Sequence, residues 1–318
     1  MARRLLEKEE FLLNDEKEIE NIVLYEKDPQ RKIAWITFNN PDKMNALPVF
    51  AFDRAAELVR DAEYDNDVKI IIFRGNGPCF GTGADAGELG YYIGYGTGKT
   101  PEERKRPSQL RRMLADRTHV GGLTAFDRTV FHCIKATICQ VHSFCYGGHF
   151  QIANSADIVI ATPDAMFAHP AWRYLGPLMP WAQMIDNLGL KKVKEICLTA
   201  RPMGADEAER FGLVTKVVPN EDLEKTVLDF AQAINMIPMD NIAVGKALIE
   251  LNMEARGLGV GYWSEWAGHG WTTNMAMMPG EWNFLKERRD KGLTQALEER
   301  DMMVAPQFRW GKGRFLKE

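Results

Sequence analysis

The fold is decided by residues 142–161, which read HSFCYGGHFQIANSADIVIA. The apolar run 136–141 precedes this segment and predicts a buried strand, and the run 158–161 at its end predicts a second strand. Gly147 and Gly148 lie between the first strand and a helical pattern. Paired glycines let the backbone come close to a ligand, and the first amides of a helix have no partner within it. The turn therefore suits a phosphate or an oxyanion, with a tight packing turn as the alternative.

The composition indicates a soluble, cytoplasmic protein. The chain has 318 residues, 45% of them hydrophobic, which is enough for one large core or two domains. A formal net charge of -4 does not indicate the excess of basic residues that binding to nucleic acid requires. Five cysteines without a CxxC pair argue against a disulfide scaffold and against a zinc knuckle. No apolar run reaches the length of a membrane span, and the charged residues 1–20 differ from a signal peptide, so we expect no membrane partner.

The residues before this segment predict a βαβ unit. Residues 22–25 and 33–38 are rich in β-forming side chains and predict two strands, and residues 48–64 have the period of an amphipathic helix. The apolar run 68–74 predicts a strand that is buried on both faces. Strand, helix and strand in this order indicate a right-handed βαβ connection in an α/β fold.

The residues after this segment predict mostly helices. The helical ranges are 180–188, 191–198, 203–212, 221–236, 241–255 and 284–300, with one short strand at 214–218. The C-terminal third is rich in Trp and Met, which fits either a core or an oligomer interface. We therefore divide the chain into an N-terminal arm (1–21), a core (22–220) and a helical C-terminal region (221–318).

Residues 90–118 predict a long flap. Its basic run, residues 99–112, is either a solvated charged face or a contact for the phosphates of an anionic ligand. Tyr91, Tyr92 and Tyr95 lie in the same range and would suit a bulky substrate.

Several motifs occur in an order typical of one family. Residues 39–47, NNPDKMNAL, resemble N-R-P-x-x-x-N-A-L, and residues 80–89, FGTGADAGEL, resemble F-x-x-G-A-D-x-x-E-x. Residues 135–150, KATICQVHSFCYGGHF, are similar to K-P-V-I-A-A-V-N-G-x-x-x-G-G-G. Residues 205–218 fit A-x-E-A-x-x-x-G-L-V-x-x-V-V. The ordered set, from about residue 22 to about residue 255, resembles the crotonase (enoyl-CoA hydratase/isomerase) superfamily.

The resemblance implies a crotonase-like spiral of βαβ units with a helical C-terminal oligomerisation region, as a homotrimer or a dimer of trimers. It implies an acyl-CoA thioester substrate and no separate cofactor, because coenzyme A is part of the substrate. It also implies that the backbone N–H groups of Ala84 and Gly148 hold the thioester oxygen as it becomes an enolate. The substrate-binding positions implied by the motifs are Met44, Ala46, Leu47, Gly83, Asp85, Tyr146 and Trp172. For Asp85, capping of a helix is the simpler interpretation.

This chain departs from the family pattern at the catalytic carboxylates. The family's hydratases use two glutamates, and the matching positions here hold Gln151 and either Ala171 or Trp172. Glutamine cannot act as an acid or a base at neutral pH, so the two-glutamate hydration is in doubt for this chain even though the fold is not.

Histidines are candidate replacements for the missing glutamates. His149 stands where the family has a third glycine, and His142 replaces the family's usual asparagine. His169 lies just before Pro170, and the family places the segments of His149 and His169 against the acyl group. Since His titrates near neutral pH, His149 and His169 are the preferred proton-transfer candidates, with a structural role as the alternative. Further candidates are Tyr146, Arg173 and Tyr174. The histidine spacings match no standard ligand set, so we expect no metal.

Three functions stay open at this point. The first is an enoyl-CoA hydratase or lyase that uses oxyanion stabilisation and a His or Tyr proton donor. The second is a C–C bond hydrolase or decarboxylase acting on a cyclic or branched β-keto acyl-CoA. The third is a catalytically silent homologue that only binds its ligand.

Overall fold

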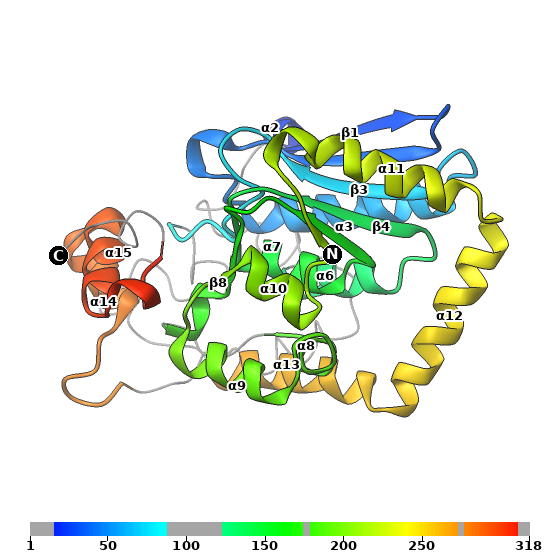
Figure 1. Ribbon diagram of the computed structural model, residues 1–318. Helices are drawn as coiled ribbons and strands as arrows, with labels where there is room; N and C mark the ends of the chain where they lie inside the picture. The colour runs from blue at the N-terminus through cyan, green and yellow to red at the C-terminus, as the bar shows by residue number, and fades with distance from the viewer. Residues whose placement is uncertain (1–15, 88–122, 174–178, 273–276, 311–318) are drawn as a thin grey trace.

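The computed structural model describes residues 16–87, 123–173, 179–272 and 277–310. Its centre is a six-stranded sheet in the order β1-β2-β3-β4-β6-β9 (Figure 1). The strands are β1 (Val23–Asp28), β2 (Ile33–Phe38), β3 (Ile70–Gly75), β4 (Ala136–Val141), β6 (Ile158–Ala161) and β9 (Lys216–Val217). Strand β1 is antiparallel to β2, and the other pairs are parallel. The predicted α/β fold is confirmed, as are the bounds of the strands at 33–38 and 136–141.

The described chain also contains α-helices around this sheet and C-terminal to it. They are α2 (Glu16–Ile22), α3 (Val49–Tyr64), α6 (Leu123–Phe131), α7 (Gly148–Ser155), α8 (Trp181–Leu188), α9 (Leu190–Thr199), α10 (Ala205–Phe211), α11 (Leu223–Asn235), α12 (Met239–Ala255), α13 (Leu258–Thr272), α14 (Phe284–Lys291) and α15 (Leu293–Met302). The predicted flap at 90–118 and most of the predicted arm lie outside the described residues. Within the described ranges, no helix has the length and apolarity needed to cross a membrane.

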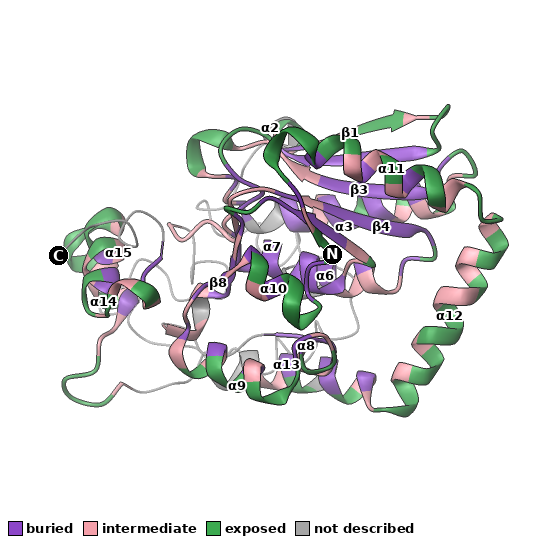
Figure 2. Ribbon diagram, in the orientation of Figure 1, coloured by how far each residue is buried: buried purple, intermediate pink, exposed green. Residues whose placement is uncertain are grey.

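The two faces of the central sheet bury alternate side chains of the same strands. Ile36 and Phe73 belong to a large core with α3, α6 and α7, whereas Trp35 and Ile72 belong to a smaller core completed by α11. All six residues of β2 are buried for this reason. Strands that are covered on both faces need continuous apolar runs, which explains why they were easy to predict from the sequence. Figure 2 shows the resulting buried layer through β3 and β4.

A second, three-stranded sheet holds the chain around the glycine turn. It has the order β5-β7-β8, with β5 (Phe144–Tyr146) parallel to β7 (Met166–Ala168) and β7 antiparallel to β8 (Met203–Gly204). The last strand of this sheet leads directly into α10, and the first leads directly into α7. This small sheet therefore fixes where helix α7 begins.

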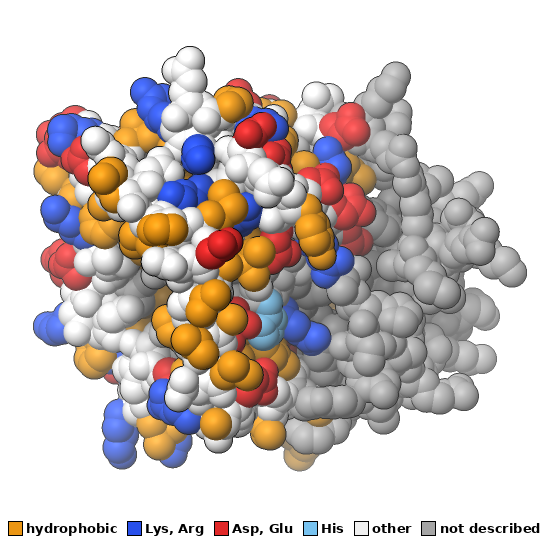
Figure 3. All heavy atoms as spheres, turned by 90° about the vertical axis from the view of Figure 1, so that its right-hand side faces the viewer, with side chains coloured by type: hydrophobic (Ala, Val, Ile, Leu, Met, Phe, Trp, Pro, Cys, Tyr) orange, Lys and Arg blue, Asp and Glu red, His pale blue; other side chains and the backbone are white. Residues whose placement is uncertain are grey.

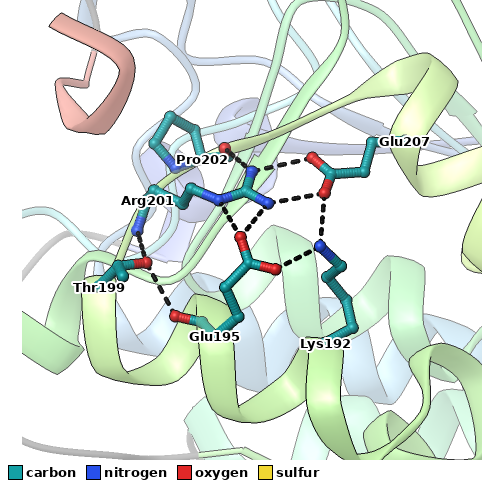
Figure 4. Close-up of polar contacts among 6 residues, drawn as sticks. All are labelled: Lys192, Glu195, Thr199, Arg201, Pro202 and Glu207. Atoms are coloured by element: carbon teal, nitrogen blue, oxygen red, sulfur yellow. Dashed lines mark hydrogen bonds and ion pairs between the residues drawn. The ribbon is translucent and has the colours of Figure 1, made fainter.

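An ion-pair network fixes the segment between α9 and β8 (Figure 4). Arg201 donates to both carboxylate oxygens of Glu207, at 2.8 and 2.6 Å, and to Glu195 at 2.7 Å. Lys192 bonds to the same two carboxylates, at 2.8 Å for Glu207. The Arg201 and Glu207 side chains are only 16% and 18% exposed, so water screens this paired fork less than it would at the surface.

Replacing Glu207 by glutamine is expected to lower the free energy of unfolding by about 1–2 kcal/mol at pH 7. Hydrogen bonding from Arg201, followed by Lys192, lowers the pKa of Glu207 from 4.5 to about 2 despite partial burial. A lowered folded-state pKa stabilises the protein above the unfolded pKa, and this contribution is lost as the pH falls from 4.5 toward 2. Urea unfolding at pH 7 and pH 4 should therefore show a smaller difference between the two proteins at pH 4.

The exposed pair Lys225–Asp229 supplies the control, Asp229→Asn, which should change the free energy of unfolding by less than about 0.5 kcal/mol. An equal loss at both pH values for Glu207→Gln would contradict the ionic explanation.

Candidate functional site

Asn45 joins two loops at the edge of the central sheet. Its side chain is fully buried and donates to the carbonyls of Asn76, at 2.8 Å, and Cys79, at 2.7 Å. Its carboxamide oxygen accepts from the N–H of Asn40 at 2.8 Å. Met44 and Asn45 both have positive φ, 56° and 53°, which Asn tolerates better than most residues. The asparagine of the N-A-L motif is thus a structural link that aligns residues 40–47 with residues 76–83.

Met44, Ala46 and Leu47, which the family resemblance assigns to substrate binding, lie directly beside the FGTGAD loop. The Met44 carbonyl accepts from the Thr82 hydroxyl at 3.1 Å, and Leu47 donates to the carbonyl of Gly83 at 2.8 Å. The Leu47 carbonyl accepts from the N–H of Asp85 at 2.9 Å, and the Ala46 carbonyl accepts from the Asn40 side chain at 2.7 Å. Leu47 therefore bonds to the residues on both sides of Ala84, so that the N–H of Ala84 faces away from it.

Gly83 and Gly147 meet face to face where the two glycine-rich segments cross. Gly147 precedes α7 with φ 58° and ψ −125°, and Gly83 has φ 88°. A β-carbon built on Gly83 would lie 3.0 Å from the α-carbon of Gly147 and 3.0 Å from the nitrogen of Gly148. A β-carbon on Gly147 would lie 3.2 Å from the α-carbon of Gly83. Both positions need glycine for their backbone angles and for this close approach.

This contact brings two backbone donors together. Gly148 is the first residue of α7, so its N–H has no acceptor within the helix. Neither this N–H nor that of Ala84 has a hydrogen-bond partner among the described residues. Gly147 itself is fixed, because it donates to the carbonyl of Ala168 at 2.9 Å. The result is a pair of free N–H groups beside the Gly83–Gly147 contact, at the positive end of a helix dipole.

His149 supports this arrangement from behind. Its ring is fully buried, and its Nδ1 accepts a hydrogen bond from the N–H of Gly83 at 3.0 Å. The ring packs edge-on against Phe38 and Phe80, with centroids 4.5 and 5.5 Å away. Burial lowers the pKa of His149 to about 3, so the imidazole is neutral at neutral pH. A neutral acceptor that orients the FGTGAD loop fits this geometry better than the proton-transfer role expected from the sequence.

The other two candidate histidines also have structural surroundings. His169 is buried, stacks on Trp172 with ring centroids 5.8 Å apart, and has its pKa lowered to about 3 by burial. His142 contacts the carbonyl of Gly77 through Nε2 at 2.9 Å. Burial and the lowered pKa of His169 do not suit an acid or base at neutral pH, whereas His142 is tied to the Gly77 carbonyl.

The side chains of Tyr146 and Trp172 lie beside the C-terminal segment. Tyr146 packs edge-on against Trp310 at 5.1 Å, and Trp172 contacts the same cluster. Arg173 holds this segment in place by donating to the carbonyls of Thr199 and Phe308. Arg173 and Tyr146 are thus tied to packing of the C-terminus, whereas Tyr174 lies outside the described residues, as does the side chain of Ala171.

Asp85 closes the turn after the FGTGAD loop. Its carboxylate accepts from the N–H of Gly87 at 2.8 Å and from Lys43 at 2.8 Å. The carbonyl of Ala86 accepts from Arg288 of α14 at 2.7 Å, so the C-terminal helices also hold this turn. The contact with Gly87 is the cap-like role expected for Asp85, although the following residues lie outside the described chain.

A buried carboxyl that the sequence did not point to lies next to Gln151. The Gln151 amide donates to Glu265 of α13 at 3.1 Å, and both side chains are 1% exposed. Glu265 and Gln151 are 114 positions apart in the chain, so no local motif could connect them. The available signal was composition, because Glu265 is the single charged residue of α13, LGVGYWSEWAGHGWT. Burying an isolated carboxyl in an apolar helix costs free energy of folding unless a partner compensates for the loss of water.

The central parallel sheet, the helices on both faces and the crossed glycine loops define a crotonase-fold protein. A family model described as Enoyl-CoA hydratase/isomerase matches residues 28–258, and the chain belongs to this family. An enoyl-CoA hydratase/isomerase from Xanthobacter autotrophicus Py2 is similar in structure, with 26% identity and a TM-score of 0.74 over 89% of this chain and 98% of that one. An enoyl-CoA hydratase from Mycobacterium smegmatis shares the fold, with 23% identity and a TM-score of 0.73 over 89% and 94% of the two chains.

A further relative comes from Rhodococcus jostii (strain RHA1). It is named as a (7aS)-7a-methyl-1,5-dioxo-2,3,5,6,7,7a-hexahydro-1H-indene-carboxyl-CoA hydrolase. It is 28% identical over 210 residues, which cover 64% of this chain and 70% of the relative.

Proposed function

We propose that this protein is an acyl-CoA-transforming enzyme that stabilises a thioester enolate between the N–H groups of Ala84 and Gly148. The observation that carries the proposal is the Gly83–Gly147 contact, beside which the N–H groups of Ala84 and Gly148 have no hydrogen-bond partner among the described residues. Donors of this kind stabilise charge that develops on a carbonyl oxygen, at about 3 kcal/mol for each donor. Membership of the enoyl-CoA hydratase/isomerase family supports an acyl-CoA thioester as the substrate, with no cofactor beyond its coenzyme A.

The reaction that we favour is of the hydratase or lyase type. A second candidate is hydrolysis of a C–C bond in a cyclic β-keto acyl-CoA. Two observations favour this second candidate: the relative named as a hydrolase of a dioxo ring carboxyl-CoA, and an amide rather than a carboxylate at position 151. Both reactions pass through an enolate, so both need the same pair of donors. They differ in whether water adds to a double bond or to a ring ketone.

Acetoacetyl-CoA tests the enolate step directly. Its enolate absorbs in the near ultraviolet, so a difference spectrum on binding should show the enolate band if Ala84 and Gly148 stabilise the anion. Mass spectrometry of a panel of enoyl-, β-keto- and cyclic acyl-CoAs then separates hydration from ring cleavage, since each adds one water to a different ester. Binding without an enolate band or any turnover would identify a silent homologue and overturn the enzymatic proposal.

We also propose that a second and a third copy of this chain cover α12. This helix has no buried residue, and the large apolar side chains Val244, Leu248 and Leu251 are 57%, 55% and 65% exposed. They are spaced three and four residues apart, so they share one face of the helix. Figure 3 shows hydrophobic side chains at the surface on this side of the molecule. Contiguous exposed apolar side chains of this kind mark interaction sites.

Replacing Leu248 by glutamate is expected to convert the trimer or hexamer to monomer, because a charge on this face is costly to bury. Light scattering after size-exclusion chromatography measures the mass. The exposed residue Glu221, on the segment before α11, gives a control in Glu221→Gln that leaves the mass unchanged. A monomeric wild-type protein would contradict the assembly proposal without touching the enolate proposal.

A further inference from the structure

The proposed enolate chemistry needs a group that takes a proton from the acyl group and returns it near neutral pH. Gln151 cannot supply it, since an amide does not titrate in this range. His149 and His169 are buried neutral rings whose pKa values burial lowers to about 3, so they hold no proton at pH 7 and are weak bases. Any proton-transferring group must therefore come from another part of the chain.

Glu265 is a titratable group in direct contact with the Gln151 side chain. Its carboxylate accepts from the Gln151 amide at 3.1 Å and is 1% exposed. Gln151 lies three residues after Gly148 on α7, and residues three apart share a face of a helix. Gln151 therefore lies on the same face of α7 as Gly148, and its side chain contacts the Glu265 carboxyl.

Asp127 of α6 is a second buried carboxyl in the same region. It is 1% exposed, and its Oδ2 has no hydrogen-bond partner in the described part of the chain, while its Oδ1 accepts from the N–H of Arg128 at 2.8 Å. Burial raises the pKa of Asp127 to about 7, which keeps the pair from losing both protons at neutral pH. An orphaned carboxylate oxygen inside a protein is rare enough to need an explanation.

The surroundings of Glu265 favour its protonated form. Burial raises the pKa of Glu265 well above 4.5, the charge of Asp127 raises it further, and Arg128 lowers it in part. Polar groups around these helices in the described part of the chain include Gln151 of α7, Tyr262 of α13, which accepts from Gln183 of α8 at 2.8 Å, and the pair formed by His132, just after α6, and Glu250 of α12. Two carboxyls thus share one nearby cation, Arg128.

We propose that Glu265 is the proton-transferring group of this site, and that its carboxyl replaces the carboxylate that the family carries at the position of Gln151. This inference rests on the proposed function. In the fraction of molecules in which Glu265 has lost its proton, its carboxylate would take the α-proton of the acyl group: the C–H bond breaks, an O–H bond forms on Glu265, and the electron pair moves to the thioester oxygen between Ala84 and Gly148. Return of the proton to carbon reverses the step. Asp127 acts as a positioning residue that keeps the pKa of Glu265 high.

Deuterium exchange into butyryl-CoA tests this assignment. The wild-type protein in D₂O should exchange the C2 protons of this ester for deuterium, and proton NMR measures the rate. The rate should rise with pH through an apparent pKa above the ordinary glutamate range. Glu265→Gln keeps the volume and the contact with Gln151 but removes the titrating group, so exchange should fall at least about 100-fold. Acetoacetyl-CoA has the same chain length and a far more acidic C2 proton, so its enolate band on binding should persist in Glu265→Gln.

Three further variants separate proton transfer from structural support. Adding Gln151→Glu to Glu265→Gln returns a carboxyl to the pocket and should restore at least a tenth of the wild-type exchange rate. Asp127→Asn should shift the pH profile of exchange to lower pH, because it removes the negative charge that raises the pKa of Glu265. Glu250→Gln, which changes a partly exposed carboxylate paired with His132, is the control and should keep the wild-type rate and profile.

The outcomes distinguish failure of the inference from failure of the proposed function. If Glu265→Gln exchanged the C2 protons at the wild-type rate, the assignment of Glu265 would be overturned and the enolate proposal would stand. The same conclusion would follow if the wild-type protein gave an enolate band but no exchange. Absence of both the enolate band and exchange in the wild-type protein would overturn both proposals. Loss of exchange in Glu265→Gln with an unchanged enolate band supports the inference.

Discussion

Replacing Gly83 by alanine is expected to lower the kcat of the proposed enolate chemistry by about 100- to 1,000-fold. The added β-carbon would lie 3.0 Å from the Gly148 nitrogen and from the α-carbon of Gly147, where no flexible side chain can move aside. The two loops must separate, and the donors of Ala84 and Gly148 then no longer converge on one oxygen. Steady-state kinetics on the best ester of the acyl-CoA panel measures the change, and the enolate band of acetoacetyl-CoA should weaken in parallel.

The control for this variant is Gly189→Ala. Gly189 joins α8 to α9 with φ 79°, and an added β-carbon there meets no atom within 4 Å. Both variants place alanine in a left-handed conformation, which costs about 1–2 kcal/mol of stability. They differ in that only the methyl group at position 83 lies against the backbone that carries the Gly148 donor. If Gly83→Ala kept the wild-type kcat with a stability loss like that of Gly189→Ala, the donors would not depend on this contact, and the enolate proposal would fail.

The backbone part of the site could be predicted because it depends on local sequence. Gly83 and Gly147 each follow a strand signal, and each needs a backbone conformation that glycine adopts readily. The central strands were predictable for a similar reason, since burial on both faces requires a continuous apolar run. The small β5-β7-β8 sheet was not predicted, because strands of two or three residues carry no periodicity. The helix expected at 284–300 is two helices, α14 and α15, separated at Gly292.

The side chains around the backbone donors could not be assigned in the same way. His149 lies beside the glycine pair in sequence, which suggested chemistry, but its role depends on the N–H of Gly83, 66 positions away. Glu265 is remote from every motif and reaches Gln151 only through the packing of α13. Whether a histidine titrates near pH 7 or is held neutral depends on its burial, which no motif records. Sequence proximity to the glycine pair therefore favoured the histidines, whereas Glu265 is 114 positions from Gln151 and no motif connects the two.

Replacing His149 by alanine is expected to lower the free energy of unfolding by about 3–5 kcal/mol, because it opens a cavity against Phe38 and Phe80 and leaves the N–H of Gly83 buried without an acceptor. Activity should fall with it, since the Gly83 loop loses its support. Added imidazole should enter the cavity and restore both the melting temperature and the rate. His142→Ala, which removes a single contact to the Gly77 carbonyl, is the control with a loss of about 1 kcal/mol and no rescue.

The pH dependence of this rescue separates support from proton transfer. The Nδ1 of His149 accepts a hydrogen bond, so the added ring must be neutral to replace it, and the pKa of about 3 shows that the native ring is neutral as well. Rescue should therefore be stronger at pH 8 than at pH 6, where much of the imidazole in solution is protonated. A proton donor would behave in the opposite way. Stronger rescue at pH 6, with no recovery of the melting temperature, would return His149 to the role of an acid and would remove the need for Glu265.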